Sequence, residues 1–386
     1  MSTPLPILLA AACEDQPADG DRQETHRKSI QWQQYLSTGN ILSMRLGLFV
    51  LLYQCPECLV GGCEAGMKVL FIHGETRQGG GAESLLHDQA EGLKRLGHET
   101  AWWYGQGSLQ AAIDEFEPDI CHLMTLHCYP MGLTPAVYLQ EHKIPHVWHI
   151  QDYWPFCKGR MLMVNGDKSC SAVKGICQHE CGEYVDYLEI VNQSFVIAGN
   201  SYTAEIYKRN GLRCDAVVEL GIDTELFKPG ERELGTIYTS CAWPDGKWKG
   251  MHVLREALIG IPYSAKLISG VPRAVVAEEL KKADIYIFPS CYAETFGLCL
   301  CEAMASGCAI IASDIAGARA QVHAGMGLLV PPRDVLALRQ AVDELTRNPK
   351  KRENMGSLAR EHVQSEHTLE AMAERFVNVY QEVKNG

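Results

Sequence analysis

Short apolar runs and amphipathic segments alternate along most of the chain. The apolar run "KVLFIH" (residues 68–73) precedes residues 82–97, whose apolar positions recur at helical spacing. Further apolar runs lie at residues 98–104, 119–124, 145–150 and 194–199, with helix-compatible segments such as 134–143 and 202–211 between them. Such alternation predicts a parallel sheet with helices on both faces.

An irregular stretch interrupts this pattern near the middle of the chain. Residues 221–235 combine glycines, charges and Pro229, as expected of a linker between domains. Apolar runs resume at residues 237–240, 265–270, 284–290 and 308–313, and a charged amphipathic helical tail begins at Val335. The total of 386 residues suits about two domains. We therefore predict two α/β domains.

Residues 1–66 differ from the rest because they lack this alternation. We predict a poorly ordered N-terminal extension there. The most apolar stretch, residues 41–60, is interrupted by charged, polar and proline residues, and its clean core is about half of the ~20 residues that a spanning helix needs. Cys55, Cys58 and Cys63 have metal-like spacing but lack a fourth ligand.

Composition and charge narrow the class of protein. A hydrophobic content of 46% with 21% charged residues is typical of a folded, water-soluble protein. The formal charge of −12 disfavours a surface that grips nucleic acid. Sixteen cysteines without a credible export signal indicate a reducing cytoplasm, with free thiols or bound metal.

Two glutamates stand eight residues apart in "SCYAETFGLCLCEAMASG", residues 290–307. The stretch predicts a loop after a strand and then a helix that ends at Gly307. Along a helix, Glu294 and Glu302 would lie about 12 Å apart, which suits the two ends of one elongated ligand. In the alternative, which spacing alone slightly favours, Glu294 caps the helix and Glu302 is a surface carboxylate.

Two further segments follow predicted strands, where parallel α/β sheets bind ligands at helix N-termini. Gly79, Gly80 and Gly81 would allow backbone to approach a ligand closely, or would form a structural turn. Lys247 and Lys249 would neutralise a diphosphate, or would serve only solubility. The residues themselves leave both alternatives open.

A cysteine-rich segment follows the strand at residues 145–150. Cys157, Cys170, Cys177 and Cys181 suit either structural zinc or free thiols, and disulfides are disfavoured in the cytoplasm. His149 and Asp152 precede this segment at a strand end. There a catalytic role and a buried core histidine are equally compatible with the pattern.

Taken together, these motifs resemble the retaining GT-B glycosyltransferases of family 4, in a shortened form. The resemblance runs from Met67 to about Tyr380, and it is carried by "ADIYIFPSCYAETFGLCLCEAMASGCAIIAS", "GMGLLVPPRDVLALRQAVDEL", "ELGIDTELFKP", "GGGAE" and "QDYWPFC". It implies two Rossmann-like domains facing a cleft, an acceptor domain at residues 67–232 and a nucleotide-sugar domain at 233–367. It also implies a final helix, residues 368–386, that crosses back to the first domain.

The same resemblance implies roles for individual residues. Glu302 would hold the donor ribose and Glu294 would lie near the transferred sugar, while Lys249 would bind phosphate. His149 is the first candidate to contact that sugar and His127 the second. The nucleotide and its diphosphate would also meet Lys247, the backbone amides of Phe296, Gly297 and Leu298, and the loop residues Gly80 and Gly81.

The chain departs from the family pattern in three places. An arginine usually stands about five residues before the lysine, where this chain has residues 242–244 ("AWP"), and Lys247 would replace it without the bidentate fork. Between Gly250 and Asp284 the chain is shorter than in typical members by about one βα unit. Gln151 occupies the place before Asp152 where the family often has histidine.

The resemblance implies transfer of a hexose, with retention, from a UDP- or GDP-sugar to a hydroxyl group. The acceptor would be a saccharide, a lipid-linked glycan or a small molecule, with no nucleic acid involved and no metal required for catalysis. We expect a cytoplasmic protein, or one in peripheral contact with the inner membrane face, and structural zinc and free thiols both stay open for the cysteine segment. One rival is a non-catalytic nucleotide-sugar-binding protein. A GT-B epimerase or phosphorylase is the other, although no pyridoxal-phosphate lysine motif supports a phosphorylase.

Overall fold

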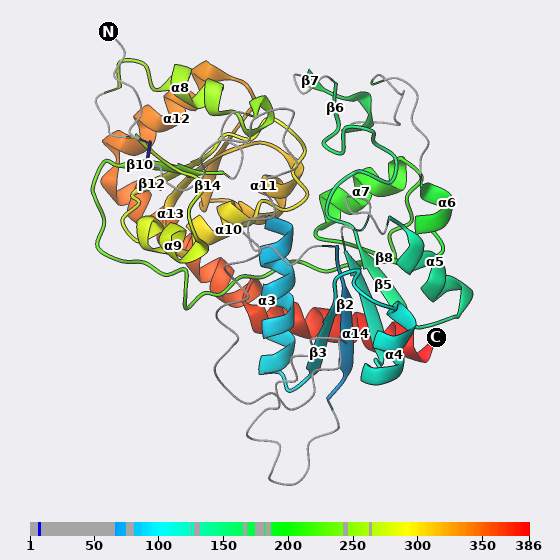
Figure 1. Cartoon of the computed structure of the whole chain (residues 1–386). Helices are drawn as coiled ribbons and strands as arrows, with labels where there is room; N and C mark the ends of the chain where they lie inside the picture. Colours follow the sequence, from blue (N-terminus) through cyan, green and yellow to red (C-terminus); the bar gives the residue numbers. More distant parts are fainter. Residues whose placement is uncertain are drawn as a thin grey trace, which may run out of the picture. The chain divides into compact units, whose positions relative to one another are not determined.

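The computed structural model describes residues 7–8, 66–74, 81–124, 126, 132–164, 168–173, 181, 187–241, 246–261 and 265–386. All of them belong to one compact unit. They form two six-stranded sheets, each with parallel strands only, and helices lie against the sheets (Figure 1). The predicted α/β class with two parallel sheets is therefore confirmed.

The first sheet has the strand order β3-β2-β4-β5-β8-β9. Its strands are β2 (Lys68–Ile72), β3 (Glu99–Trp103), β4 (Ile120–Met124), β5 (His146–His149), β8 (Phe195–Ala198) and β9 (Ala216–Val217). The helices between them are α3 (Gly81–Arg95), α4 (Leu109–Phe116), α5 (Thr134–Glu141), α6 (Leu188–Val191) and α7 (Ser201–Arg209). A short antiparallel pair, β6 (Met163–Val164) and β7 (Lys168–Ser169), lies between β5 and β8 in the chain.

The second sheet has the strand order β1-β11-β10-β12-β13-β14. Its strands are β1 (Ile7–Leu8), β10 (Ile237–Ser240), β11 (Ala265–Ile268), β12 (Ile285–Phe288), β13 (Ala309–Ser313) and β14 (Gly327–Val330). Its helices are α8 (Met251–Ala257), α9 (Arg273–Leu280), α10 (Leu298–Ala305), α11 (Ala316–Gln321), α12 (Val335–Arg347) and α13 (Pro349–Glu366). The strands β1 and β14 were not predicted. The predicted helical tail is three helices, since α14 (Leu369–Asn385) follows α13 after a break.

Helix α14 packs on the elements of the first sheet, as predicted for the last helix (Figure 1). Its N-cap is Thr368, whose hydroxyl accepts a hydrogen bond from the Ala371 amide at 3.1 Å. Gly92 of α3 lies so close to it that a Cβ there would meet the Leu369 carbonyl at 2.4 Å. Near the other end, Tyr380 Oη is 2.6 Å from His122 Nδ1 of β4. The C-terminus therefore completes the first domain.

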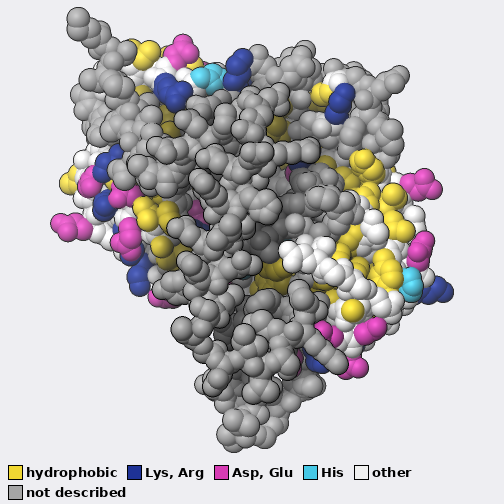
Figure 2. Space-filling model, viewed as in Figure 1, with side chains coloured by type: hydrophobic (Ala, Val, Ile, Leu, Met, Phe, Trp, Pro, Cys, Tyr) yellow, Lys and Arg dark blue, Asp and Glu magenta, His cyan; other side chains and the backbone are white. Residues whose placement is uncertain are grey.

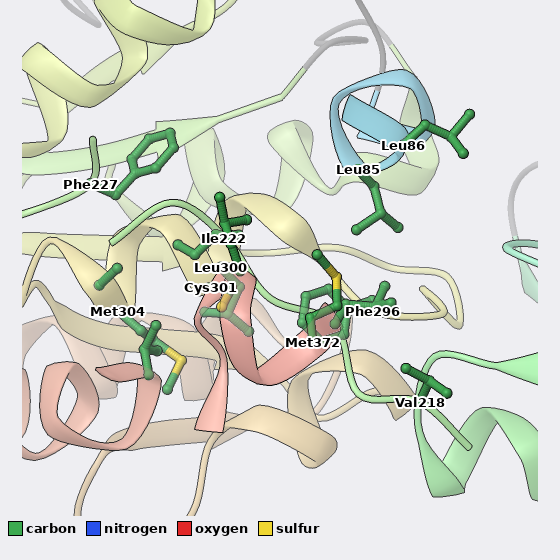
Figure 3. Packing of buried hydrophobic residues seen from close by; sticks show 14 of the residues in the cluster. Leu85, Leu86, Val218, Ile222, Phe227, Phe296, Leu300, Cys301, Met304 and Met372 are labelled. Carbon is green, nitrogen blue, oxygen red and sulfur yellow. The ribbon is translucent and has the colours of Figure 1, made fainter. Parts of the chain in front are cut away.

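One hydrophobic cluster contains buried residues from the elements that form and cover both sheets (Figure 3). Leu85 comes from α3, Leu300 from α10, Met372 from α14, and Ile222 from the irregular stretch after β9. The Ile222 amide donates to the His367 carbonyl at 2.9 Å, which ties that stretch to the break between α13 and α14. Burial of each large apolar side chain contributes about 1.5–3 kcal/mol, so this cluster stabilises both sheets together.

The described surface carries both signs of charge. In Figure 2, lysine and arginine side chains are interspersed with acidic ones on the part of that face which is coloured by type. Within the described ranges, no helix combines the length and the apolarity that a bilayer span requires.

Candidate active site

The candidate site lies beyond the carboxyl ends of β10 and β12. Apart from β1, β10 is the first strand of the second sheet along the chain. The next two strands along the chain, β11 and β12, pair with opposite sides of β10. A crevice for ligands forms at such a switch point of a parallel sheet. A 3-10 turn, Lys247–Lys249, follows β10, and the loop 289–297 leads from β12 into α10.

Lys249 and Glu294 meet at this point. Lys249 Nζ is 2.8 Å from Glu294 Oε1 and 5.2 Å from the centre of the Tyr292 ring. The Ser290 hydroxyl also donates a hydrogen bond to Glu294 Oε1. Burial alone would lower the pKa of Lys249, but the Glu294 carboxylate outweighs burial and raises it, so the lysine stays charged at neutral pH. Both residues of this ion pair, Lys249 and Glu294, were candidate site residues in the sequence analysis.

The structure rules out the alternative in which Glu294 caps the helix and Glu302 is a surface carboxylate. Each glutamate is only 6% exposed, so Glu302 is not a surface carboxylate. Helix α10 has Gly297 as its N-cap and no side-chain cap, so Glu294 does not cap it. Two buried carboxylates with cationic partners suit a polar ligand site.

The N-terminus of α10 offers backbone donors. Gly297 adopts a left-handed conformation with φ of 88°. The amides of Phe296, Gly297 and Leu298 donate to no other group in the described part of the chain. Gln321 Nε2 donates to the Phe296 carbonyl and, at 3.1 Å, to the Gly317 carbonyl, which holds this turn in place. Free amides at a helix N-terminus bind anions, as predicted for these three residues.

Glu302 belongs to an ion-pair clasp, formed by Asp88, Arg273 and Glu302, that the sequence analysis missed. Arg273 Nε is 2.8 Å from Glu302 Oε1, and Arg273 Nη1 is 2.7 Å from Asp88 Oδ1 of α3. Burial raises the pKa of both carboxyl groups, and Arg273 only partly offsets it. A short glycine-containing loop leads from β11 to Arg273, the first residue of α9. This position at the binding edge of the sheet is a signal that could have identified Arg273.

The loop after β12 is also held by the first domain. The Thr295 carbonyl accepts hydrogen bonds from Asn200 Nδ2 and, at 3.0 Å, from the Thr203 hydroxyl of α7. The Thr295 hydroxyl donates to the Gln151 carbonyl at 2.6 Å. Glu294 therefore sits one residue from an anchor that bridges both domains.

Gly250 explains why a glycine follows Lys249. It has φ of 71°, and a Cβ there would lie 1.8 Å from the Pro289 carbonyl oxygen. Only glycine allows the turn to approach the β12 loop this closely, which brings Lys249 to Glu294. Lys247 lies on the exposed side of the same turn. Its predicted role in place of the missing arginine stays a prediction, because residues 242–245 lie outside the described ranges.

His149 does not fit its predicted role. Its side chain is fully buried, with Nδ1 3.1 Å from Gln89 Nε2 and its ring 5.4 Å from that of Phe376 in α14. Burial lowers the pKa of His149 to about 3, so it is neutral. The alternative of a core histidine is favoured, because helix α14 covers the ring and leaves no exposed surface for a sugar. His127 and Gly80 lie outside the described residues, whereas Gly81 is exposed at the start of α3.

The cysteine segment is only partly described. Cys157 and Cys170 are buried, Cys181 is partly buried, and Cys177 lies outside the described residues. Burial raises the pKa of the Cys157 thiol, and Cys181 and Cys170 raise it further. The Cys181 thiol donates to the Met163 carbonyl at 3.6 Å. Where side chains are described, no three potential ligands are grouped to hold a metal ion, and the zinc site stays a prediction.

Asp152 has an unusual environment. Its Oδ1 accepts a hydrogen bond from the Trp154 amide at 2.8 Å, and burial raises its pKa from 3.8 to about 7. The folded state therefore binds a proton that the unfolded state releases between these two values. The stabilisation is complete below about pH 4 and is lost as pH rises through about 7.

We expect Asp152→Asn to remove part of this pH dependence. Its free energy of unfolding relative to wild type should rise by up to about 4 kcal/mol between pH 4 and pH 7.5, since each pKa unit corresponds to about 1.4 kcal/mol. Urea denaturation at several pH values measures the difference. Asp114→Asn, at an exposed aspartate of α4, is the control. Parallel wild-type and Asp152→Asn curves would contradict the raised pKa.

Solved structures with this arrangement of two sheets identify the fold class. Sucrose-phosphate synthase from Thermosynechococcus elongatus superposes with a TM-score of 0.65 at 17% identity, covering 82% of this chain and 99% of that one. Anabaena Alr3699/HepE, in complex with UDP and glucose, gives 0.62 at 17% identity, covering 82% and 99%. The chain has the GT-B fold of these enzymes.

The second domain carries the sequence signature of a family. Residues 252–362 match the model described as Glycosyl transferases group 1, and this chain carries a domain of that family. A phosphatidyl-myo-inositol mannosyltransferase of Mycobacterium leprae is 33% identical over 131 residues, 34% of this chain and 35% of the relative. A GDP-mannose-dependent mannosyltransferase of Corynebacterium glutamicum, acting on a monoacylated phosphatidylinositol monomannoside, is 31% identical over 134 residues, 33% and 35%. The matched segments thus span about a third of these relatives.

Proposed function

We propose that the protein is a retaining glycosyltransferase of family 4 that moves a hexose from a UDP- or GDP-sugar to a hydroxyl group. The observation that carries this proposal is the buried contact between Lys249 and Glu294 beside the free amides at the start of α10. A lysine, a helix N-terminus and a carboxylate are the groups that a diphosphate attached to a sugar requires.

Each side chain has a role in the proposed mechanism. The amides of Phe296, Gly297 and Leu298 bind the diphosphate, and Lys249 stabilises the negative charge that develops on it. Glu294 binds hydroxyls of the transferred sugar. Glu302 binds the ribose through Oε2, since Arg273 contacts Oε1. In this proposal the two glutamates bind different ends of one ligand.

The reaction breaks one bond and forms another at the anomeric carbon. As the bond to the phosphate oxygen breaks, the sugar takes on positive charge, and the acceptor hydroxyl oxygen bonds to the same face of the carbon. The proton of that hydroxyl passes to the leaving diphosphate. The chain's contribution is to hold the diphosphate charge in a partly dry site, where preorganised donors act strongly.

The comparisons support the choice of donor. The matched relatives are named as mannosyltransferases, one of them GDP-mannose-dependent, and one neighbour in structure was solved with UDP and glucose. The acceptor of this chain is a compound with a free hydroxyl group. The proposal places the protein where such nucleotide sugars are made, in the cytoplasm.

A donor screen tests the proposal. The purified chain is mixed with UDP- and GDP-hexoses, and thermal shift and nucleoside diphosphate release are measured. We expect millimolar UDP or GDP to raise the melting temperature by mass action, and the matching nucleotide sugar to release that nucleotide. Glu294→Gln should abolish release, whereas Glu256→Gln, at an exposed position of α8, should not.

Four outcomes would contradict the proposal or part of it. The absence of any thermal shift would remove the donor site. Binding without turnover, unchanged in Glu294→Gln, would favour a non-catalytic binding protein. Release of a sugar phosphate in place of the nucleotide would favour a phosphorylase. Inversion of the anomeric configuration in the product, measured by NMR, would overturn the retaining mechanism alone.

A further inference from the structure

A pocket of about 450 Å³ opens beside the donor loop. Its walls come from the segment after β5, including Gln151, Tyr153, Lys158 and Arg160, and from Tyr292 and Thr295 of the donor loop. Glu294 lies between these last two residues in sequence, so the pocket borders the place proposed for the transferred sugar. The volume lies in the range of small-molecule sites.

Hydrogen bonds hold the walls in a defined geometry. The Tyr207 hydroxyl contacts the carbonyls of Ile150 and Asp152 at 2.9 and 3.1 Å. The Tyr153 amide donates to the Arg160 carbonyl at 3.1 Å, and the Arg160 amide to the Cys157 carbonyl at 3.0 Å. Arg160 itself adopts a left-handed conformation with φ of 60°, which is costly for a non-glycine residue. This turn places two cations on one wall.

One polar atom of a lining residue is buried without a partner. Gln151 Nε2 forms no hydrogen bond to any described group. Buried donors normally have an acceptor. A ligand oxygen in the pocket would supply one.

The charge of the walls selects the kind of ligand. Lys158 and Arg160 are both exposed, and Arg160 lies within electrostatic reach of Asp152. The described lining residues thus include two cations and one carboxylate, Asp152, which already accepts a hydrogen bond from the Trp154 amide. The wall therefore has a net positive charge, in a chain whose overall charge is −12. An anionic group is the complementary ligand.

We infer that this pocket is the acceptor subsite and takes an acceptor that bears a phosphate or carboxylate group. Lys158 and Arg160 bind the anion, and Gln151 donates a hydrogen bond to one of its oxygens or to a neighbouring hydroxyl. The acceptor hydroxyl then reaches the sugar held at Glu294. This inference rests on the proposed function, because it names the substrate class of the same site.

Matched acceptors test the inference. Release of nucleotide from the accepted UDP- or GDP-hexose is measured with glucose, glucose 6-phosphate and glucuronic acid as acceptors. We expect kcat/KM at least about tenfold higher for one of the two anionic acceptors than for glucose, as one charge-assisted contact suggests. In Lys158→Ala/Arg160→Ala this preference should fall to about twofold or less, with the thermal shift by UDP or GDP unchanged. Arg347→Ala/Lys350→Ala, exposed and of equal charge change, should keep the preference.

A binding measurement separates this inference from the proposed function. Thermal shift by glucose 6-phosphate against glucose, without nucleotide, reports on the pocket even if no donor turns over. Equal shifts and equal kcat/KM for charged and neutral acceptors would overturn the inference. So would a full preference in the Lys158→Ala/Arg160→Ala variant. A preference for UDP-glucuronate over UDP-glucose as donor, without one among acceptors, would place the anion on the donor and also overturn it.

Discussion

Replacement of Lys249 by methionine is expected to lower kcat for sugar transfer by about 10²- to 10³-fold, the typical cost of one preorganised charge donor at a reacting centre. Lys249 is the cation nearest to Glu294, at 2.8 Å, and methionine keeps the length of the side chain without the charge. Initial rates of nucleoside diphosphate release at saturating donor measure the effect. Lys350→Met, at an exposed position of α13, is the matched control and should retain the wild-type rate.

Stability and catalysis can be told apart at this pair. Lys249→Met leaves Glu294 buried beside Ser290 without its cation, so some stability is lost as well. Lys249→Met/Glu294→Gln removes both charges and should recover most of the free energy of unfolding, yet remain inactive. A double variant that regained activity together with stability would show that Lys249 acts only in folding.

Replacement of Arg273 by methionine is expected to lower the free energy of unfolding by about 3–5 kcal/mol, the usual cost of breaking a buried ion pair. Arg273 is the common partner of Asp88 and Glu302, whose side chains are 9% and 8% exposed. Its loss leaves two buried carboxylates, both with raised pKa, next to each other. Urea denaturation at pH 7 measures the change.

The carboxylates themselves provide the control for this second experiment. Arg273→Met combined with Asp88→Asn and Glu302→Gln should recover most of the lost stability, because no charge then remains unpaired. Arg255→Met, at an exposed arginine of α8, should change it by less than about 0.5 kcal/mol. A loss below about 1 kcal/mol in Arg273→Met would show that the clasp contributes little.

The hydrophobic pattern predicted most strands and helices because each lies in a fully buried sheet or against one. Runs such as residues 237–240 and 308–313 became β10 and β13, every residue of which is buried. Strand β14 was missed although its sequence, GLLV, is apolar, and its burial is mixed, with Leu329 38% exposed. The break at His367 agrees with the start of the final helix at residue 368, which the family resemblance had implied.

At the site, the sequence indicated a residue only where the pattern that marks it lies within a short stretch of the chain. Glu294, Lys249 and the amides of residues 296–298 lie at strand ends, a position that sequence pattern and family resemblance indicate directly. His149 also lies at a strand end, but α14, more than 200 residues later, covers it. Arg273 and Asp88 meet across 185 positions, and no local pattern reports such a pair.

The amino-acid sequence alone determined the α/β class, the two-domain organisation and the segment that carries both glutamates. It did so because periodicity and strand ends are local properties of the chain. Only the tertiary structure decided which side chains are partners: the lysine of Glu294, the clasp on Glu302, the burial of His149 and the cationic wall of the pocket. These depend on packing between distant segments, since ion pairing and desolvation are set by neighbours in space.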